Sequence, residues 1–291
     1  MKWLTTALLL LLAGLAPGHV QAEPRIFTVH SGEHLEFARE LCRAALAAAG
    51  MEASFTHFPP AQNKRLYAEL ASGNLAIAFT PPDEDTFVLE KQGLIRALRV
   101  PLERGLLGYR ICLVRDEDSD LLGNVRKTED LKKVRIGQGI GWGDIAVYRD
   151  AGIDVVEAPF NSVSDPVKAL ASRHFDALPL GVNEYQLFLQ AYNKEGAGIA
   201  TDRHIVISYP WFRYVWVSTA TKDSKLLFEA LDKGFGIIAA NGEFVAIYEK
   251  YKDAEPRKHL AGRRTIHLQS PYSTDDDIDP RFRHLIIRTP R

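Results

Sequence analysis

The chain has 291 residues, of which 25% are charged, and its formal net charge is −1 at pH 7. This near-balance provides no basic surface for nucleic acid or for an acidic membrane, so we expect neither partner. The length fits one large domain or two small ones.

The first residues predict a secretory signal peptide. Lys2 gives a positive start, Leu4–Leu15 is apolar but too short to span a bilayer, and Val20-Gln21-Ala22 has the small residues of a cleavage site. Cleavage after Ala22 would leave an exported protein that starts at Glu23; the alternative is an uncleaved N-terminal anchor. No later stretch of the sequence is apolar enough to cross a membrane.

Taken in chain order, the residues after the signal peptide predict two βαβαβ units. The first unit is expected to have strands at 25–30, 53–58 and 75–79. Its first helix is expected from about 35 to 50, and its second helix is expected to end at 72. In the second unit, strands beginning near 134, 155 and 175 alternate with helices near 145–150 and 164–173. Every polar turn follows a strand, and ligands of such sheets bind at the carboxyl ends of the strands.

Strands containing glycine join the two units. The first joining segment is 99–115, with Gly105 and Gly108 inside a strand-like run, and the strands 205–208 and 214–218 lead back. Two amphipathic helices and a charged tail, expected to wrap the surface, complete the chain. We expect a signal peptide at 1–22, a first lobe of 23–105 plus 206–291, and a second lobe of 106–205, with a hinge between the lobes.

The two cysteines, Cys42 and Cys112, fall in apolar patterns on a helix and on a strand. An exported chain could oxidise them. Nothing in the sequence brings them together, so we expect two buried thiols rather than a disulfide.

Several runs, in this order, resemble a bacterial subgroup of the extracellular solute-binding protein family 3. They are Gly105–Arg110, Gly137–Asp144, Phe175–Gly181 and Arg263–Leu268. The resemblance implies an α/β, two-lobed type 2 periplasmic binding protein fold with hinge strands. It also implies a monomer in the periplasm that captures a small polar, amino-acid-like solute for an inner-membrane ABC importer, without a cofactor.

One departure from the family concerns the ligand. Amino-acid binders of the family typically place an arginine shortly after the third strand, where it grips the ligand carboxylate. Here the segment Thr80–Asp85 carries acids instead. The resemblance therefore implies a fold and a binding role, but not an ordinary amino-acid ligand.

Two other functions stay open on the same scaffold. One is a ligand-sensing module for a membrane signalling protein. The other is a dehydratase-like enzyme in which Glu33 and Glu184 act as acid and base across the cleft. No nucleophile motif is present, and we expect no catalytic residue and no metal site, because the spacing of His30, Glu33 and His34 matches no helical ligand pair.

The glycine-rich turn from Gly139 to Asp144 is the first candidate for ligand contact. Its glycines let backbone N–H groups approach an anionic or carbonyl group. The alternative is a tight turn with Asp144 as the helix N-cap and Trp142 in the core.

Charged and amide side chains supply the other candidates. Arg110 suits a carboxylate or phosphate, or else a salt bridge between the lobes. Asn183 and Glu184 either meet a ligand amine, as the resemblance implies, or start a helix. The complete set of expected ligand-binding residues is Ser31, Glu33, Arg65, Thr80, Arg110, Gln138, Gly141, Trp142, Asp144, Asn161, Asn183, Glu184 and Trp211.

Overall fold

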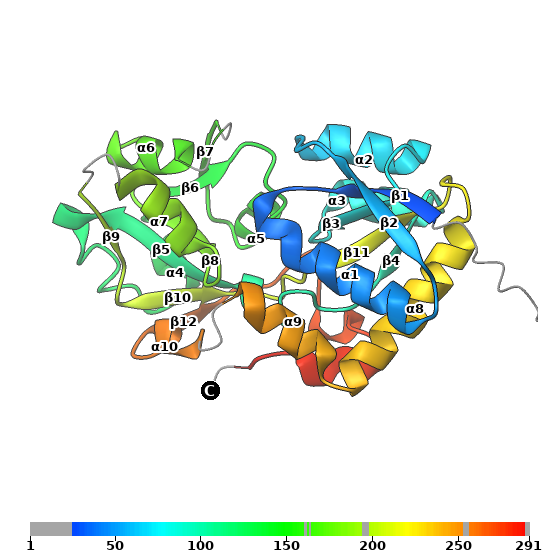
Figure 1. Ribbon diagram of the computed structural model, residues 1–291. Coiled ribbons are helices and arrows are strands. Elements are labelled where there is room, and N and C mark those ends of the chain that lie inside the picture. The colour runs from blue at the N-terminus through cyan, green and yellow to red at the C-terminus, as the bar shows by residue number, and fades with distance from the viewer. Residues whose placement is uncertain (1–24, 160–161, 163, 194–197, 253–255, 289–291) are drawn as a thin grey trace, which may run out of the picture.

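The computed structural model describes residues 25–159, 162, 164–193, 198–252 and 256–288. Within them the chain forms two α/β lobes, which Figure 1 shows side by side. The expected signal peptide and Asn161 lie outside the described residues. None of the described helices combines the length and the apolar character that crossing a membrane requires.

The first lobe is built on a five-stranded sheet in the order β2-β1-β3-β11-β4. The first three strands of the chain run parallel, and β11 returns antiparallel between β3 and β4. The strands are β1 (Arg25–His30), β2 (Ala53–Phe58), β3 (Ile77–Thr80), β4 (Ile95–Leu98) and β11 (Tyr214–Ser218). The helices of this lobe are α1 (Glu36–Ala48), α2 (Asn63–Ser72), α3 (Glu84–Lys91), α8 (Ser224–Ala240) and α9 (Glu243–Tyr251).

Close packing of α1 against α8 organises the helices of the first lobe. Phe37, Leu41 and Ala45 are buried on one face of α1, at the helical spacing seen in the sequence. Gly234 of α8 lies so near this face that a Cβ there would be 1.8 Å from the carbonyl oxygen of Ala45. The missing side chain at position 234 therefore sets the distance between the two helices.

The second lobe holds a sheet in the order β12-β10-β5-β8, with β9 paired to β5 and a parallel pair formed by β6 and β7. A bridge between Ile136 and Ala177 joins that pair to the segment leading into β8. The strands are β5 (Tyr109–Arg115), β6 (Ile136–Gly139), β7 (Val155–Ala158), β8 (Leu178–Gly181), β9 (Ile199–Thr201), β10 (Ile205–Ser208) and β12 (Arg264–His267). The helices are α4 (Thr128–Leu131), α5 (Ile145–Asp150), α6 (Asp165–Ala171), α7 (Tyr185–Asn193) and α10 (Arg257–Leu260).

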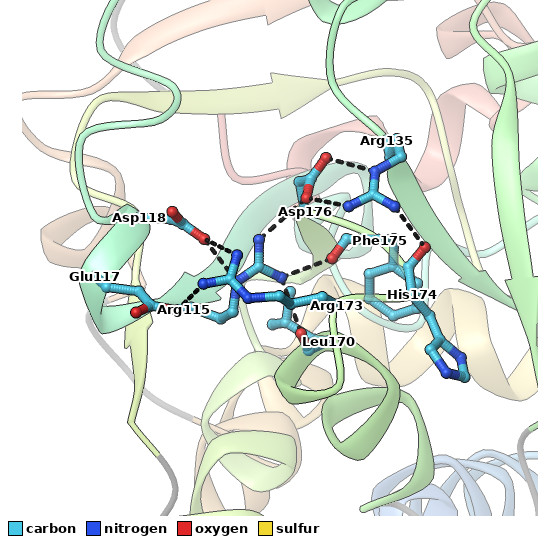
Figure 2. Close-up of polar contacts among 9 residues, drawn as sticks. All are labelled: Arg115, Glu117, Asp118, Arg135, Leu170, Arg173, His174, Phe175 and Asp176. Atoms are coloured by element: carbon cyan, nitrogen blue, oxygen red, sulfur yellow. Dashed lines mark hydrogen bonds and ion pairs between the residues drawn. The ribbon is translucent and has the colours of Figure 1, made fainter.

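Arg115, a buried arginine at the end of β5, holds several segments of the second lobe together. The guanidinium of Arg115 donates to the carbonyls of Leu170 (2.9 Å) and Phe175 (2.8 Å) and to the carboxylate of Asp176 (3.0 Å). Figure 2 shows that Arg135, the residue before β6, reaches the same carboxylate. Arg115 thereby holds the end of α6 and the segment before β8 against the end of β5.

The C-terminal tail connects both lobes. Its strand β12 pairs in parallel with β10 in the second lobe. The chain then returns to the first lobe as a 3-10 helix, Pro280–Leu285, seen in red below α8 in Figure 1. There the carbonyl of Leu285 accepts from Arg104 Nε (3.0 Å), and Ile287 N–H donates to the Arg104 carbonyl (2.9 Å). Since Arg104 lies in the first segment that joins the lobes, these bonds fasten the tail to that joining segment.

Strand pairing departs from the expected division of the chain. The tail was expected to wrap the surface of the first lobe, but 205–208 and 264–267 both belong to the second lobe's sheet. The segment after β3 also forms α3 and β4, and neither element was predicted from the sequence. Cys42 and Cys112 are buried and free.

Candidate functional site

A chain of buried ion pairs lies where the two lobes meet. Its first member is Arg110 on β5, whose Nη2 lies 3.0 Å from Oδ2 of Asp144. The hydroxyl of Tyr209 accepts from Arg110 Nε and donates to Asp144 Oδ2, both at 2.8 Å. Since Arg110 and Asp144 are 5% and 4% exposed, each charge is compensated by the other in the interior.

The second arginine of this chain, Arg213, precedes β11 in the first lobe. Its Nε lies 2.7 Å from Oε1 of Glu103, and its Nη1 donates to the carbonyl of Phe79 in β3 at 3.2 Å. The other oxygen of Glu103 accepts from Asn183 Nδ2 at 2.6 Å. Asn183 follows β8, so this amide ties the second lobe to the joining segment that carries Glu103.

Glu184 connects the pair formed by Arg110 and Asp144 with the pair formed by Arg213 and Glu103. Its Oε1 lies 3.3 Å from Arg213 Nη2, and its Oε2 lies 3.8 Å from Arg110 Nη1. We call Asp144, Arg110, Glu184, Arg213 and Glu103 together the interlobe ion network. The two acids that Arg110 meets, Asp144 and Glu184, both belong to the second lobe, so the ion pair that crosses the boundary is the one between Arg213 and Glu184. Asn183 lies in the same cluster.

The neighbours of the two glutamates shift their pKa values in opposite directions. Burial alone would raise the pKa of Glu103, but Arg213, Lys252 and the hydrogen bond from Asn183 together lower it to about 2. Burial raises the pKa of Glu184, and the nearby charge of Glu103 adds to that rise. Of these two glutamates, Glu184 is therefore the one whose ionised form its surroundings favour less.

The glycine-rich turn before α5 packs largely against itself. A Cβ on Gly139 would lie 2.4 Å from the ring of Trp142, which is half-buried and meets Phe188 edge to face. Asp144 starts α5 but makes no side-chain cap bond, because its carboxylate turns toward Arg110 instead. The exposed Gly141 accepts a hydrogen bond from Asn63 of the first lobe through its carbonyl.

Several other expected contact residues have structural partners. Ser31 donates to the carbonyl of Phe58 and Arg65 is exposed with its guanidinium over the Phe58 ring. Thr80 is buried and accepts a long hydrogen bond, 3.4 Å, from Tyr67. Trp211 is buried beside Tyr209. These four residues are not part of the interlobe ion network.

Two expected residues stand apart from this pattern. Gln138 is fully buried in β6, and neither polar atom of its side chain has a hydrogen-bond partner among the described residues. The backbone of Glu33 lies in the short 3-10 helix Glu33–Leu35, and its side chain is not among the described ones.

Sequence reasoning missed Arg213, Glu103 and the hydroxyl of Tyr209. A signal for Arg213 was present, because it is the single charged residue in the apolar run from Tyr209 to Ser218. Glu103 carried no such signal. Its role depends on which side of the joining segment faces the second lobe, and that is decided by tertiary packing.

His30 at the end of β1 should make the stability of the folded protein measurably sensitive to acid. Burial, assisted by Arg213, lowers its pKa to about 3. Because the unfolded chain binds the proton near pH 6.5 and the folded chain does not until about pH 3, stability falls as pH falls through this window. We expect His30 alone to lower the free energy of unfolding by about 2 kcal/mol between pH 7 and pH 5.

The check is urea unfolding of the wild type and His30→Gln at both pH values. We expect the variant to lose about 2 kcal/mol less than the wild type between pH 7 and pH 5. An equal loss in both proteins would show that His30 is not the group responsible.

Two open hollows on the surface of the first lobe lie away from the network. One of about 430 Å³ is lined by residues of α8 and the start of β1, and one of about 260 Å³ lies between β11 and the start of α8. Neither is lined by a member of the interlobe ion network. In this conformation the charged groups at the lobe boundary contact one another.

The chain resembles known proteins at the level of structure. No protein-family model and no curated protein matches the chain. Among solved structures, the substrate-binding protein of an amino acid ABC transporter shares 15% identity at a TM-score of 0.51, covering 78% of this chain and 98% of its own. The GluR0 ligand-binding core in complex with L-glutamate shares 11% at 0.53, covering 78% and 97%.

A histidine kinase sensor domain with similarity to periplasmic binding proteins shares 18% identity at a TM-score of 0.53, covering 78% of this chain and 96% of its own. The chain has the two-lobed α/β fold of periplasmic binding proteins. This confirms the predicted fold class. At identities this low the likeness establishes the fold alone.

Proposed function

We propose that the chain is a periplasmic solute-binding protein that captures a small polar molecule between its lobes for an inner-membrane ABC importer. The observation that carries the proposal is the interlobe ion network. Surfaces that stay in permanent contact are usually apolar at their centre. Here Glu184 and Asn183 of the second lobe meet Arg213 and Glu103 through an ion pair and a hydrogen bond, and a polar solute can satisfy these groups in turn.

Closure around a solute follows from this arrangement. The solute would contact Arg213 of the first lobe and Arg110 and Asn183 of the second, so it would stabilise the conformation that brings these groups together. Export and removal of residues 1–22 belong to the same proposal. The solved structures of substrate-binding proteins with this fold support it.

The proposal is tested by a thermal-shift screen of the purified protein. The panel contains amino acids, polyamines, organic acids, sugars and peptidoglycan fragments. A ligand at 100 times its Kd adds about 2.7 kcal/mol to the free energy of unfolding. At roughly 2–4 °C per kcal/mol, one chemical class should raise Tm by several degrees.

A result without any shift needs one further measurement. Mass spectrometry of the denatured protein reports whether a small molecule was carried through purification. No shift and no released molecule would contradict solute binding.

Sensing is the second candidate function, supported by the neighbour that is a histidine kinase sensor domain. In that case the closed protein would act on a membrane sensor instead of a permease. Crosslinking in membranes separates the two functions, because transport predicts permease subunits as the captured partner and sensing predicts a kinase.

The enzyme alternative makes a different prediction about the ligand. A dehydratase-like enzyme would return a changed compound, whereas a binding protein returns its ligand intact. In the structure Glu184 is held by two arginines, which suits a binding group better than a proton-transferring one.

A further inference from the structure

Glu184 bridges the two lobes within the interlobe ion network, because its two oxygens face guanidiniums of different lobes. Oε1 lies 3.3 Å from Nη2 of Arg213, next to β11 in the first sheet. Oε2 lies 3.8 Å from Nη1 of Arg110, on β5 in the second sheet. One carboxylate therefore spans the boundary between the lobes.

Each arginine also has a closer carboxylate of its own. Arg110 lies 3.0 Å from Asp144, and Arg213 lies 2.7 Å from Glu103. The side chain of Glu184 is 20% exposed, compared with 6% for Asp144 and 2% for Glu103. Glu184 is thus the most weakly held carboxylate of the three and the one with access to solvent, so its departure leaves neither guanidinium without a partner.

The carboxylate of Glu184 sits in a niche left by a missing side chain. A Cβ on Gly181 would lie 3.0 Å from Oε2 of Glu184 and 3.1 Å from the side chain of Leu107. The absence of that atom leaves room for one carboxylate between Arg110 and Arg213. The site therefore has both the charge and the size for this group.

We propose that Arg110 and Arg213 form a carboxylate site that Glu184 occupies until a carboxylate of the solute displaces it. The inference rests on the proposed solute-binding function and deepens it by naming the solute class, a small organic acid. Displacement exchanges one negative group for another, so the buried arginines stay compensated throughout. Arg213 also reaches the carbonyl of Phe79, which places a guanidinium at the end of β3, where the segment Thr80–Asp85 supplies none.

Glu184→Gln tests the proposal, because it keeps the size of the side chain and removes the competing charge. Succinate and L-glutamate serve as carboxylate probes and putrescine as a cationic one, in isothermal titration calorimetry of the wild type and the variant. When a resident group must leave first, the apparent Kd equals the intrinsic Kd divided by the fraction of sites that the group leaves free. We therefore expect succinate or L-glutamate to bind Glu184→Gln roughly tenfold or more tightly than the wild type.

The matched control is Glu157→Gln. Glu157 forms an ion pair with Arg149 at 2.7 Å, where the arginine side chain is 62% exposed, so affinity should stay at the wild-type value. Circular dichroism confirms that each variant is folded. Glu184→Ala is the second variant, with the same expected gain. Adding Arg213→Gln to Glu184→Gln should abolish that gain.

Two outcomes would overturn the inference and leave different consequences. If the wild type binds putrescine and Glu184→Gln does not, Glu184 is itself the group that meets a cation, and the solute-binding function stands. If neither Glu184 variant binds succinate or L-glutamate more tightly than the wild type, the arginine pair is not a carboxylate site. The thermal-shift screen then decides on solute binding independently.

Discussion

Replacing Arg110 with glutamine is expected to lower the free energy of unfolding by about 3–5 kcal/mol. The guanidinium compensates Asp144, which is 4% exposed and also receives the hydroxyl of Tyr209. Without Arg110, an ionised carboxylate would remain in the interior with one neutral donor. Removing one partner of a buried pair is costly because the charge left behind has lost its hydration.

Thermal and urea unfolding measure this effect. A loss of 3–5 kcal/mol corresponds to a Tm lower by roughly 6 °C or more. The control Arg149→Gln breaks the exposed pair with Glu157 and should change stability by less than about 1 kcal/mol. Adding Asp144→Asn to Arg110→Gln should recover part of the loss, because the uncompensated charge is then gone. A loss below about 1 kcal/mol in Arg110→Gln would mean that the pair is exposed to water in solution.

The second large effect is expected from Gly234→Ala in α8. The added Cβ would lie 1.8 Å from the carbonyl oxygen of Ala45 and 2.4 Å from its carbon. Both are backbone atoms of α1, so no side chain can turn aside and the helices must separate. We expect a loss of about 3 kcal/mol, at the upper end of overpacking costs.

The same helix provides the matched control. Gly236 lies two residues further on, and the nearest atom to its added Cβ is the Arg281 guanidinium at 3.7 Å. Alanine is favoured over glycine in a helix interior, so Gly236→Ala should raise stability by roughly 0.5–1 kcal/mol. Opposite signs in urea unfolding are the expected result. A gain in stability for Gly234→Ala, like that of the control, would indicate that α1 and α8 are not in close contact.

Much of the fold could be predicted from local pattern. The strands at 25–30, 53–58, 205–208 and 214–218 are observed with the expected bounds, because each is a short β-rich run between turn residues. The unit order predicted two α/β lobes for the same reason. Local periodicity carries this information since it depends on neighbours in sequence.

The misses have identifiable physical causes. No helix was predicted after β3, where Asp83 and Thr86 cap each other and start α3. The strand 264–267 lies in a charged tail, and its partner strand is more than fifty residues away in sequence. No local pattern reveals such a pairing, because strand choice depends on which edge of the sheet is free.

The site was predictable in its residue types but not in its pairing. Arg110 lies within a strand of the second lobe, and Asp144, Asn183 and Glu184 follow strands of that lobe, which made their convergence foreseeable. Arg213 enters from the other lobe through the second joining segment. Which acid meets which arginine therefore depends on the angle between the lobes, and that angle is not a local property of the sequence.

The tail strand β12 has a consequence for how copies of the chain behave toward one another. In the sheet order β12-β10-β5-β8, it lies between β10 and solvent. β10 contributes the buried Ile205, Val206 and Ile207, a short β-branched run of the kind that pairs readily with a foreign edge. By supplying its own last strand, the chain occupies this edge of β10, and we expect it to be less prone to strand exchange and aggregation through β10 than a chain that ends before β12.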